Sequence, residues 1–420
     1  MKEIQTQQQT ANTTPPFRID VKLHQILYKP ESRTTIKEAP EPEALPEPPF
    51  PLRKDAKEMT KSEYQKLNAI RTWKTWGKPY FKSLYYRKDL RPIIPYLFTE
   101  WKCNLDCHYC WSYNNKVKGM TEDVAKRSID WLHSIGSRVL ALMGGEPLLR
   151  PKFIHKIVYY SALKDIFVYL PTNGRLMTPD VVDRLGDAGI ATVNLAVDSV
   201  KDRKELPKAL EPIRSYFDYL VKQQHKYGYT VMFNINITRI NMDDVKELTE
   251  IAHDNGIATD YHINETPMTE QTHFKHLDEN STYITPDEYK KVDDLLDYLN
   301  DKRKQGYKII NPIRHMEDMK QLMRGEVPEW DCRAGQNSLI IRTDGTLAPC
   351  FPMYSATYDW GAIENPKFDN KQLAEMKTEC SKHCLSTCNY ILAHCYNVRR
   401  ILTWTFKQAM NGFRGVTDTI

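Results

Sequence analysis

The chain has 420 residues, 41% of them hydrophobic, which is enough for one large domain or two to three small ones. Its net charge of +5 is small for this length, and without a basic repeat it argues against a nucleic-acid partner. No apolar run approaches the roughly 18 residues that span a membrane, and the N-terminus lacks the apolar segment of a signal peptide.

The N-terminal 91 residues form two segments of unusual composition. Residues 1–52 are a disordered or proline-rich extension, polar at first and then rich in proline. Residues 53–91 are basic and aromatic and include a helix, with aromatic residues at Trp73, Trp76, Tyr80, Phe81, Tyr85 and Tyr86. This segment is either a substrate-recognition arm or a segment packed on the core. Packing is favoured because aromatic side chains bury large areas.

Short apolar runs alternate with helical patterns over residues 92–310. The predicted strands are 96–99, 138–143, 166–170, 192–197, 231–237 and 258–263, and the predicted helices are 122–134, 151–162, 179–188, 207–226 and 242–255. Thr121 and Thr178 are typical helix starts, and Gly256 is a typical stop. This alternation predicts parallel β/α units, whose functional loops follow the strands.

The nine cysteines fall in two patches, at residues 103–110 and 332–395. Disulfides of secreted proteins are seldom confined in this way. An odd count in two clusters, with no export signal, indicates metal ligation in a reducing cytoplasm. We therefore expect a cytoplasmic protein.

The first patch follows the first predicted strand and reads Cys103-Asn-Leu-Asp-Cys107-His-Tyr-Cys110. Three thiols can ligate three irons of a four-iron cube and leave the fourth iron open to a small molecule. A zinc site remains an alternative, but zinc favours four ligands in two CxxC pairs, and no such pair partners this run. The spacing therefore favours an iron–sulfur cluster.

This run resembles the motif of the radical S-adenosylmethionine (radical SAM) superfamily, in which an aromatic residue, here Tyr109, precedes the third cysteine. The resemblance implies a [4Fe-4S] cluster whose open iron chelates the methionine group of S-adenosylmethionine. Reductive cleavage of the cofactor would release a 5′-deoxyadenosyl radical that abstracts a hydrogen atom from substrate. The implied fold class is α/β, with a partial (β/α)6 TIM-like barrel over residues 92–310 that leaves a lateral opening.

Two further motifs follow the second and third predicted strands. The run Gly144-Gly145-Glu146-Pro147 resembles the GGEP motif of that superfamily, which holds the methionine amino group. Its glycines let the backbone approach a ligand, and Glu146 can accept from an ammonium group. Thr172, Asn173 and Gly174 match the TNG run of many members. Each string alone could be a simple turn, but three matches at successive strand ends are hard to attribute to chance.

The later strands supply further candidates for cofactor and substrate binding. If Asp198 aligns with the aspartate of the family, Ala196 replaces a serine near the cofactor carboxylate, and Ser199, Asn194 or Arg203 could take its place. Alternation puts three polar residues of the fifth strand on one face, and the sixth strand repeats the pattern. These residues are Asn234, Asn236, Thr238, Asp260, His262 and Asn264. A histidine on a strand is more often structural than catalytic.

The second cysteine patch lies in residues 325–400, ahead of a C-terminal helix or tail at 401–420. It contains Cys332, Cys350, Cys380, Cys384, Cys388 and Cys395, with a hairpin signal around Thr343-Asp344-Gly345. The opening C-x12-G-x4-C resembles the SPASM/twitch domain of radical SAM enzymes, whereas the later intervals depart from it. The resemblance implies one or two auxiliary iron–sulfur clusters. His383 and His394 lie beside these cysteines and could ligate or be ordinary polar residues.

The resemblance implies net oxidation with an auxiliary cluster, first in peptide or protein maturation. Dehydrogenation or epimerisation of a small molecule, such as an aminosugar, is an alternative of the same superfamily. A non-catalytic zinc-binding interaction protein is a further alternative. The implied partners are a flavodoxin- or ferredoxin-type reductant and a substrate peptide or small molecule. An oxidation needs a base, and the candidates are Asp331, Asp359, Tyr354, Tyr358 and Asp260.

Overall fold

The computed structural model describes most of the chain from residue 44 to residue 394. The described residues are 44–51, 57–86, 89–110, 114–263, 280–328, 330–354, 359–381, 384–394, 399, 402, 403 and 406, without the side chains of Glu379, Thr387, Ile391 and His394. The expected disorder of residues 1–16, most of the proline-rich run and most of the tail at 401–420 lie outside them. No helix in these ranges is long and apolar enough to cross a membrane.

One sheet of eight strands organises the fold, in the order β6-β5-β4-β3-β2-β1-β7-β8. The strands are β1 (Ile94–Glu100), β2 (Val139–Gly144), β3 (Phe167–Thr172), β4 (Thr192–Ala196), β5 (Thr230–Ile237), β6 (Ala258–Ile263), β7 (Ser338–Ile341) and β8 (Leu347–Ala348). The pairs among β1 to β6 are all parallel. The predicted partial barrel with its six parallel strands is therefore confirmed.

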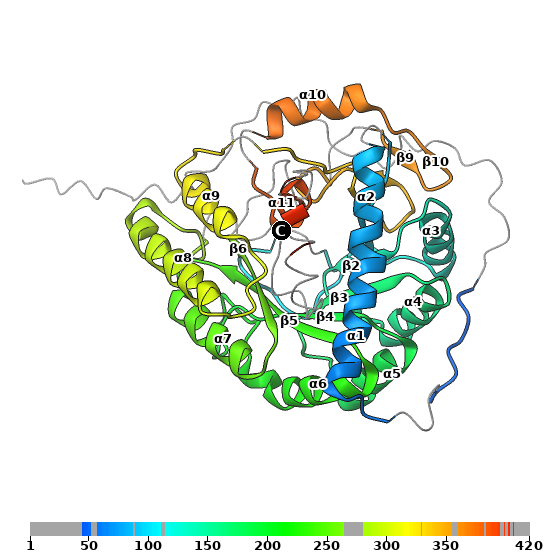
Figure 1. Cartoon of the computed structure of the whole chain (residues 1–420), viewed down its shortest axis with the longest axis horizontal. Coiled ribbons are helices and arrows are strands. Elements are labelled where there is room, and N and C mark those ends of the chain that lie inside the picture. The colour runs from blue at the N-terminus through cyan, green and yellow to red at the C-terminus, as the bar shows by residue number, and fades with distance from the viewer. Residues whose placement is uncertain are drawn as a thin grey trace, which may run out of the picture.

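Helices follow the strands and form a ring outside the sheet (Figure 1). They are α3 (Glu122–Ser134), α4 (Pro151–Leu163), α5 (Pro179–Ala188), α6 (Arg214–Tyr227) and α7 (Met242–Asp254), followed by α8 (Tyr289–Lys304) and α9 (Ile313–Met323). Thr121 and Thr178 cap α3 and α5 as predicted, since each side chain accepts from a backbone N–H of the first turn. Gly256, at φ 64°, follows α7.

The start predicted for α6, at residue 207, is wrong by seven residues. The backbone of residues 207–210 is hydrogen bonded to the segment that follows β4, because Asp198 N donates to Lys208 O and Leu210 N donates to Ser199 O, at 2.7 and 2.9 Å. A short 3-10 helix, Glu211–Ile213, then leads into α6. Pairing with a distant segment thus overrides the local helical pattern.

The two faces of the sheet have different partners. Leu97, Leu140 and Val193 face the outer helices and belong to the main hydrophobic core. Tyr96 and Phe98 alternate with Leu97 and belong to a separate inner cluster with Ala141, Ile340 and Tyr354. On β3 and β6 every second residue is only partly buried, and these residues face inward. The inner face is therefore where the barrel can receive a molecule.

The C-terminal part continues the barrel sheet. Strand β7 pairs in parallel with β1, and β8 pairs antiparallel with β7, which confirms the predicted hairpin. A second small sheet is formed by β9 (Gly361–Ala362) and β10 (Asn365–Pro366), and the helices α10 (Asn370–Cys380) and α11 (Thr387–His394) follow. Figure 1 shows α11 over the centre of the helical ring.

Polar contacts hold α11 in that place. Its Asn389 accepts from Ser338 of β7, and its Tyr390 donates to Asp318 of α9. The ring of Tyr390 also stacks on His315, with centroids 4.1 Å apart. Helix α11 therefore joins the barrel sheet to α9.

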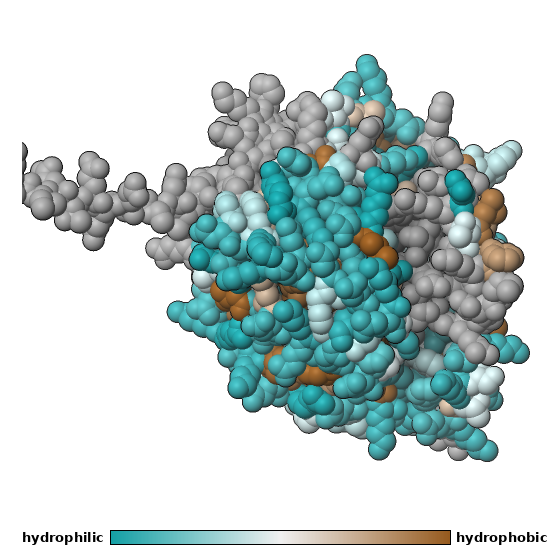
Figure 2. Space-filling model, turned by 60° about the vertical axis from the view of Figure 1, so that its left-hand side comes forward, coloured by the Kyte–Doolittle hydropathy of each residue, from teal (hydrophilic) through white to brown (hydrophobic). Residues whose placement is uncertain are grey.

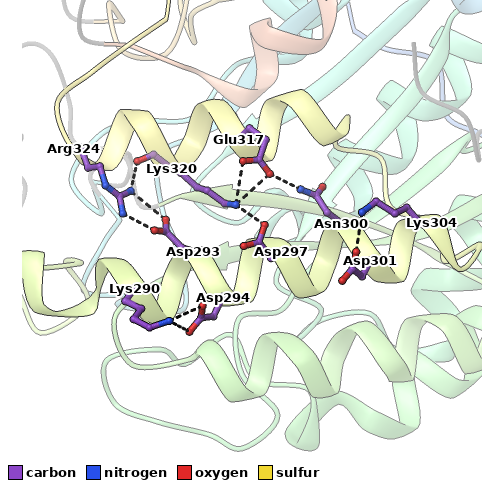
Figure 3. Close-up of polar contacts among 10 residues, drawn as sticks. All are labelled: Lys290, Asp293, Asp294, Asp297, Asn300, Asp301, Lys304, Glu317, Lys320 and Arg324. Atoms are coloured by element: carbon purple, nitrogen blue, oxygen red, sulfur yellow. Dashed lines mark hydrogen bonds and ion pairs between the residues drawn. The ribbon is translucent and has the colours of Figure 1, made fainter.

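Helices α8 and α9 are linked by ion pairs and hydrogen bonds (Figure 3). The contacts between them are Asp293–Arg324, Asp297–Lys320 and Asn300–Glu317. The side of the molecule that carries these helices is mainly hydrophilic (Figure 2). Partly exposed ion pairs of this kind contribute about 0–1 kcal/mol each, so they align the helices more than they stabilise the fold.

The N-terminal helices α1 (Lys61–Thr72) and α2 (Lys78–Tyr85) are joined by a π-helical turn, Trp73–Gly77. Helix α1 docks on the N-terminal ends of the strands, where the Tyr64 hydroxyl donates to Tyr229 O at 2.8 Å and Arg71 donates to Gly228 O. Of the aromatic residues expected to pack on the core, Tyr80 is buried and Trp76 packs beside it. The expectation is wrong for the others, since Trp73, Phe81, Tyr85 and Tyr86 are 38–82% exposed.

Candidate functional site

The loop that carries Cys103, Cys107 and Cys110, here called the cysteine loop, follows β1. It is hydrogen bonded, together with the end of β1, to the Gly144-Gly145 turn at the end of β2. Gly145 N donates to Glu100 O, and Glu146 N donates to Lys102 O, each at 2.8 Å. A Cβ atom on Gly144 would lie 2.1 Å from Glu100 O, and one on Gly145 would lie 2.2 Å from Lys102 O. The close backbone approach that these glycines permit is therefore to the cysteine loop.

Glu146 connects the ends of β2 and β3. Its carboxylate is buried and accepts from Leu148 N, Thr172 Oγ1 and Asn173 N at 2.8–2.9 Å. Burial raises the pKa of Glu146, and these hydrogen bonds oppose the shift. Asn173 Nδ2 also donates to Asn104 Oδ1 in the cysteine loop, at 2.8 Å. The three motifs found in the sequence thus form one contiguous region.

Tyr109 connects the cysteine loop to the end of β4. Its hydroxyl donates to one carboxylate oxygen of Asp198, while the other oxygen accepts from Asn236 N at 2.8 Å. Burial raises the pKa of Tyr109, and the charge of Asp198 raises it further. Asp198 is thus placed beside the cysteine loop.

Lys208 is a functional candidate that the sequence reasoning missed. Its ammonium lies 5.1 Å from the centre of the Tyr109 ring. Burial alone would lower the pKa of Lys208, but the charges of Asp198 and of the three cysteines outweigh burial and raise it. A lone lysine in a loop gives no periodic or motif signal. It reaches the site because residues 208–210 pair with residues 198–199.

The three thiols of the first patch lie near one another. Burial raises the pKa of Cys103 to about 11, and the charge of Cys110 adds to the shift. Cys107 is buried, and its pKa is raised by burial and by the charges of both other cysteines, against the opposing charge of Lys208. Three thiols that come together from one loop, beside the cation of Lys208, are a donor set that fits an iron–sulfur cluster.

Within the described residues, no group of three or more His, Cys, Asp or Glu side chains is arranged to hold a metal ion. A zinc ion needs four ligands around one atom. A four-iron cluster is ligated at separate irons, so its cysteines need only surround it. Cys103, Cys107 and Cys110 could each ligate a different iron of such a cluster.

Two of the three residues proposed to replace the missing serine are engaged in the fold. The Ser199 hydroxyl is buried and donates to Lys201 O and Leu206 O. Arg203 donates to Ile240 O and pairs with Asp244. Asn194 points to the inner face of the sheet, where its Nδ2 donates to the Tyr169 hydroxyl. Lys208 is a cation whose charge acts on both Cys103 and Cys107.

The polar residues of β5 and β6 meet as the alternation predicts. Asn234 Nδ2 and His262 Nε2 are 2.9 Å apart, and the same nitrogen of His262 lies 3.4 Å from Asp260 Oδ2. Asn236 is buried near Asp198. Thr238 differs, since its hydroxyl donates to Asn241 in a turn beyond the strand.

The structure separates Cys332, Cys350 and Cys380 of the second cysteine patch from Cys388. Burial raises the pKa of Cys350 well above its usual range, and the charges of Cys380 and Cys332 add to the shift, so these three lie together. Lys377 donates to Cys332 O beside them. Cys384 packs against the main core, whereas Cys388 packs with the inner barrel cluster against Tyr96.

The base candidates are dispersed. Asp331 is exposed and pairs with Arg333, and Asp359 pairs with Lys367. Tyr354 is buried, with its ring 5.2 Å from that of Trp101. Asp260 alone of these lies among the inward residues of β6. Cys395, His383, Tyr358, Asn264 and the His394 side chain lie outside the described residues.

Comparison with known proteins relates the central part of the chain to one superfamily. The sequence model of the Radical SAM superfamily matches residues 102–270. The chain is 30% identical to an AdoMet-dependent heme synthase of Methanosarcina barkeri over 38% of this chain and 47% of that protein, and 30% identical to a GTP 3′,8-cyclase of Clostridium perfringens over 41% and 55%. It thus spans about half the length of the curated relatives it matches.

A solved structure shares the fold over a longer stretch. Streptococcus suis SuiB, solved with its precursor peptide SuiA, covers 72% of this chain, and this chain covers 70% of SuiB, with a TM-score of 0.54 and 16% identity. In this chain, the cysteine loop follows the first strand of a partial β/α barrel. Residues 102–270, which match the Radical SAM superfamily model, contain the cysteine loop and strands β2 to β6.

Proposed function

We propose that this protein is a radical SAM enzyme that matures a peptide or protein by net oxidation, with help from an auxiliary iron–sulfur cluster. The observation that carries the proposal is the convergence of Cys103, Cys107 and Cys110 with Lys208 at the ends of the barrel strands. When bound, the cluster and S-adenosylmethionine supply an electron and a 5′-deoxyadenosyl radical. The protein holds and orients both.

The surrounding residues suit the two ends of a methionine group. A carboxylate has about four acceptor sites, and Glu146 uses three of them within the protein. The remaining site would accept from the methionine ammonium. Ala196 cannot donate to the carboxylate of the cofactor, and Lys208 would do so in its place. A charge-assisted hydrogen bond of this kind contributes about 1.5–3 kcal/mol.

The second centre would lie on the C-terminal part of the sheet. Cys332, Cys350 and Cys380 lie close together, and Cys384, which packs against the same core, is a candidate for a fourth ligand. An auxiliary cluster held there would accept the electron that a substrate radical gives up. A flavodoxin- or ferredoxin-type protein would supply the electron for cofactor cleavage.

A small molecule is the alternative substrate. The sequence relatives with 30% identity are named for heme synthesis and GTP cyclisation, whereas the fold neighbour was solved with a precursor peptide. We place the peptide first because SPASM-type C-terminal domains accompany peptide maturation in the family that the sequence resembles. The zinc-binding alternative is weaker, since the superfamily match covers the first cysteine loop.

Anaerobic purification tests the proposal. We expect a brown protein that contains iron and sulfide and absorbs at about 400 nm, and this absorbance should bleach on reduction. Addition of dithionite and S-adenosylmethionine should yield 5′-deoxyadenosine. Replacing Cys103, Cys107 and Cys110 by alanine should abolish 5′-deoxyadenosine formation, while the exposed change Ser134→Ala should not. A colourless protein that contains zinc and no iron would overturn the proposal.

A further inference from the structure

The inner face of the barrel brings together side chains from strands that are not neighbours. Asp260 lies on β6, Tyr169 on β3 and Tyr96 on β1. Burial raises the pKa of both tyrosines, and the charge of Asp260 raises it further in each. Four strands separate β1 from β6 in the sheet, so the charge of Asp260 acts on Tyr96 across the barrel interior.

Two buried acceptor atoms in this interior have no hydrogen-bond donor among the residues that the structure describes. They are Asp260 Oδ1 and Asn194 Oδ1. Asn194 is only 2% exposed, and its Nδ2 atom donates to the Tyr169 hydroxyl. Asp260 Oδ2 lies 3.4 Å from His262 Nε2. Each residue is therefore held through one atom and leaves the other for a ligand, because buried polar atoms are rarely left unpaired.

The chemistry of these atoms selects the ligand. A carboxylate oxygen and an amide oxygen both accept hydrogen bonds, and neither donates. The negative charge of Asp260 in a buried setting adds attraction for a cation. The tyrosine rings beside it provide apolar walls for the carbon chain that carries such a group.

We propose that the barrel interior recognises a protonated amine or another cationic nitrogen of the substrate, with Asp260 as its principal acceptor and Asn194 beside it. The inference rests on the proposed function, because it states what the substrate presents to the interior. The same nitrogen could belong to a lysine-like side chain of a peptide or to an amine of a metabolite, such as an aminosugar.

Calorimetric titration of the cluster-loaded protein with S-adenosylmethionine bound tests this inference without turnover. Two matched pairs serve as probes: Nα-acetyl-lysine methylamide against Nα-acetyl-norleucine methylamide, and glucosamine against glucose. We expect the amine of one pair to bind at least about tenfold more tightly than its neutral partner. The pair that shows the preference identifies a peptide or a metabolite as the source. Equal affinities within both pairs would overturn the inference.

Variants then locate the recognition. Asp260→Asn should remove the preference for the amine, and Asp260→Glu should retain part of it. The matched control Asp243→Asn, on the exposed surface of α7, should behave as the unchanged protein. Circular dichroism and the melting temperature confirm that each variant is folded. A folded Asp260→Asn protein that keeps the full preference would contradict the role of Asp260.

The test of the amine preference can fail or succeed independently of the proposed function. Formation of 5′-deoxyadenosine by the unchanged protein is measured on the same preparation. If the amine preference is present and 5′-deoxyadenosine is absent, only the proposed function fails. If 5′-deoxyadenosine forms and neither pair is discriminated, only the inference about the amine fails.

Discussion

The ammonium of Lys208 lies 5.1 Å from the ring centre of Tyr109, the aromatic residue that precedes the third cysteine of the loop. The Tyr109 hydroxyl also donates to Asp198, so this one residue contacts both a cation and an anion of the site. The second cysteine group has a comparable neighbour in Lys377, which lies beside Cys332. In each patch, a lysine can offset the negative charge of ligated thiols.

Replacing Lys208 by methionine should weaken the binding of S-adenosylmethionine by about ten- to a hundredfold, because a charge-assisted hydrogen bond to its carboxylate is lost. Equilibrium dialysis of the iron-loaded protein measures this affinity. Lys208→Arg should recover part of it, and the exposed Lys201→Met should have no effect. Unchanged affinity in Lys208→Met would rule out the carboxylate contact.

Gly145→Ala should destabilise the cysteine loop, because its Cβ would lie 2.2 Å from Lys102 O. Overpacking of this kind costs about 1–3 kcal/mol. We expect a lower iron content as well as a lower denaturation midpoint in urea. Gly136→Ala is the control, since among the described residues no atom lies within 4 Å of its Cβ and only the cost of its φ of 85° remains. Full iron content in Gly145→Ala would contradict the prediction.

Iron analysis tests the division of the second cysteine patch. Cys332→Ala and Cys350→Ala should each remove about four irons per chain, the content of one auxiliary cluster. Cys388→Ala should keep the full iron content, because Cys388 packs against Tyr96 on the inner barrel face. Loss of the same iron in all three variants would show that Cys388 is a ligand together with the others.

Glu250 of α7 should give the fold an acid-sensitive contribution. Burial opposes its ionisation, but hydrogen bonds from Lys302, Tyr298 and Tyr307 outweigh burial and lower the pKa of Glu250 to about 2. A lowered folded-state pKa stabilises the fold above the unfolded value of about 4.3, and this contribution is lost as the pH falls toward 2.

Because the Glu250 side chain is 41% exposed, solvent screening limits the effect to about 1 kcal/mol. Melting temperatures between pH 5 and pH 2 measure this effect in the unchanged protein and in Glu250→Gln. The exposed Glu247→Gln is the control. The unchanged protein should lose stability more steeply than Glu250→Gln over this range. Parallel curves for these two proteins would show that the hydrogen bonds to Glu250 contribute nothing.

Much of the barrel was predictable, because its buried parallel strands are short apolar runs bounded by helix starts and stops. The GGEP and TNG runs could be placed at the ends of β2 and β3 because these two strands were predicted. Lys208 was not predictable, since pairing with a distant segment brings it to the site. The place of Cys388 was not predictable either, because spacing along the chain does not tell which way a helix presents a thiol.

The pairing of β7 with β1 fixes the distance between the two cysteine patches. Cys103 follows the end of β1, whereas Cys350 follows β8, which runs back toward the level at which β1 begins. The seven residues of β1 span roughly 23 Å. Under the proposed function, the substrate would lie between a centre that starts the radical reaction and a centre that collects the electron. The hydrogen-bonded pairing of β1 with β7 would then set the length of this electron path. Neither centre would have to move toward the other.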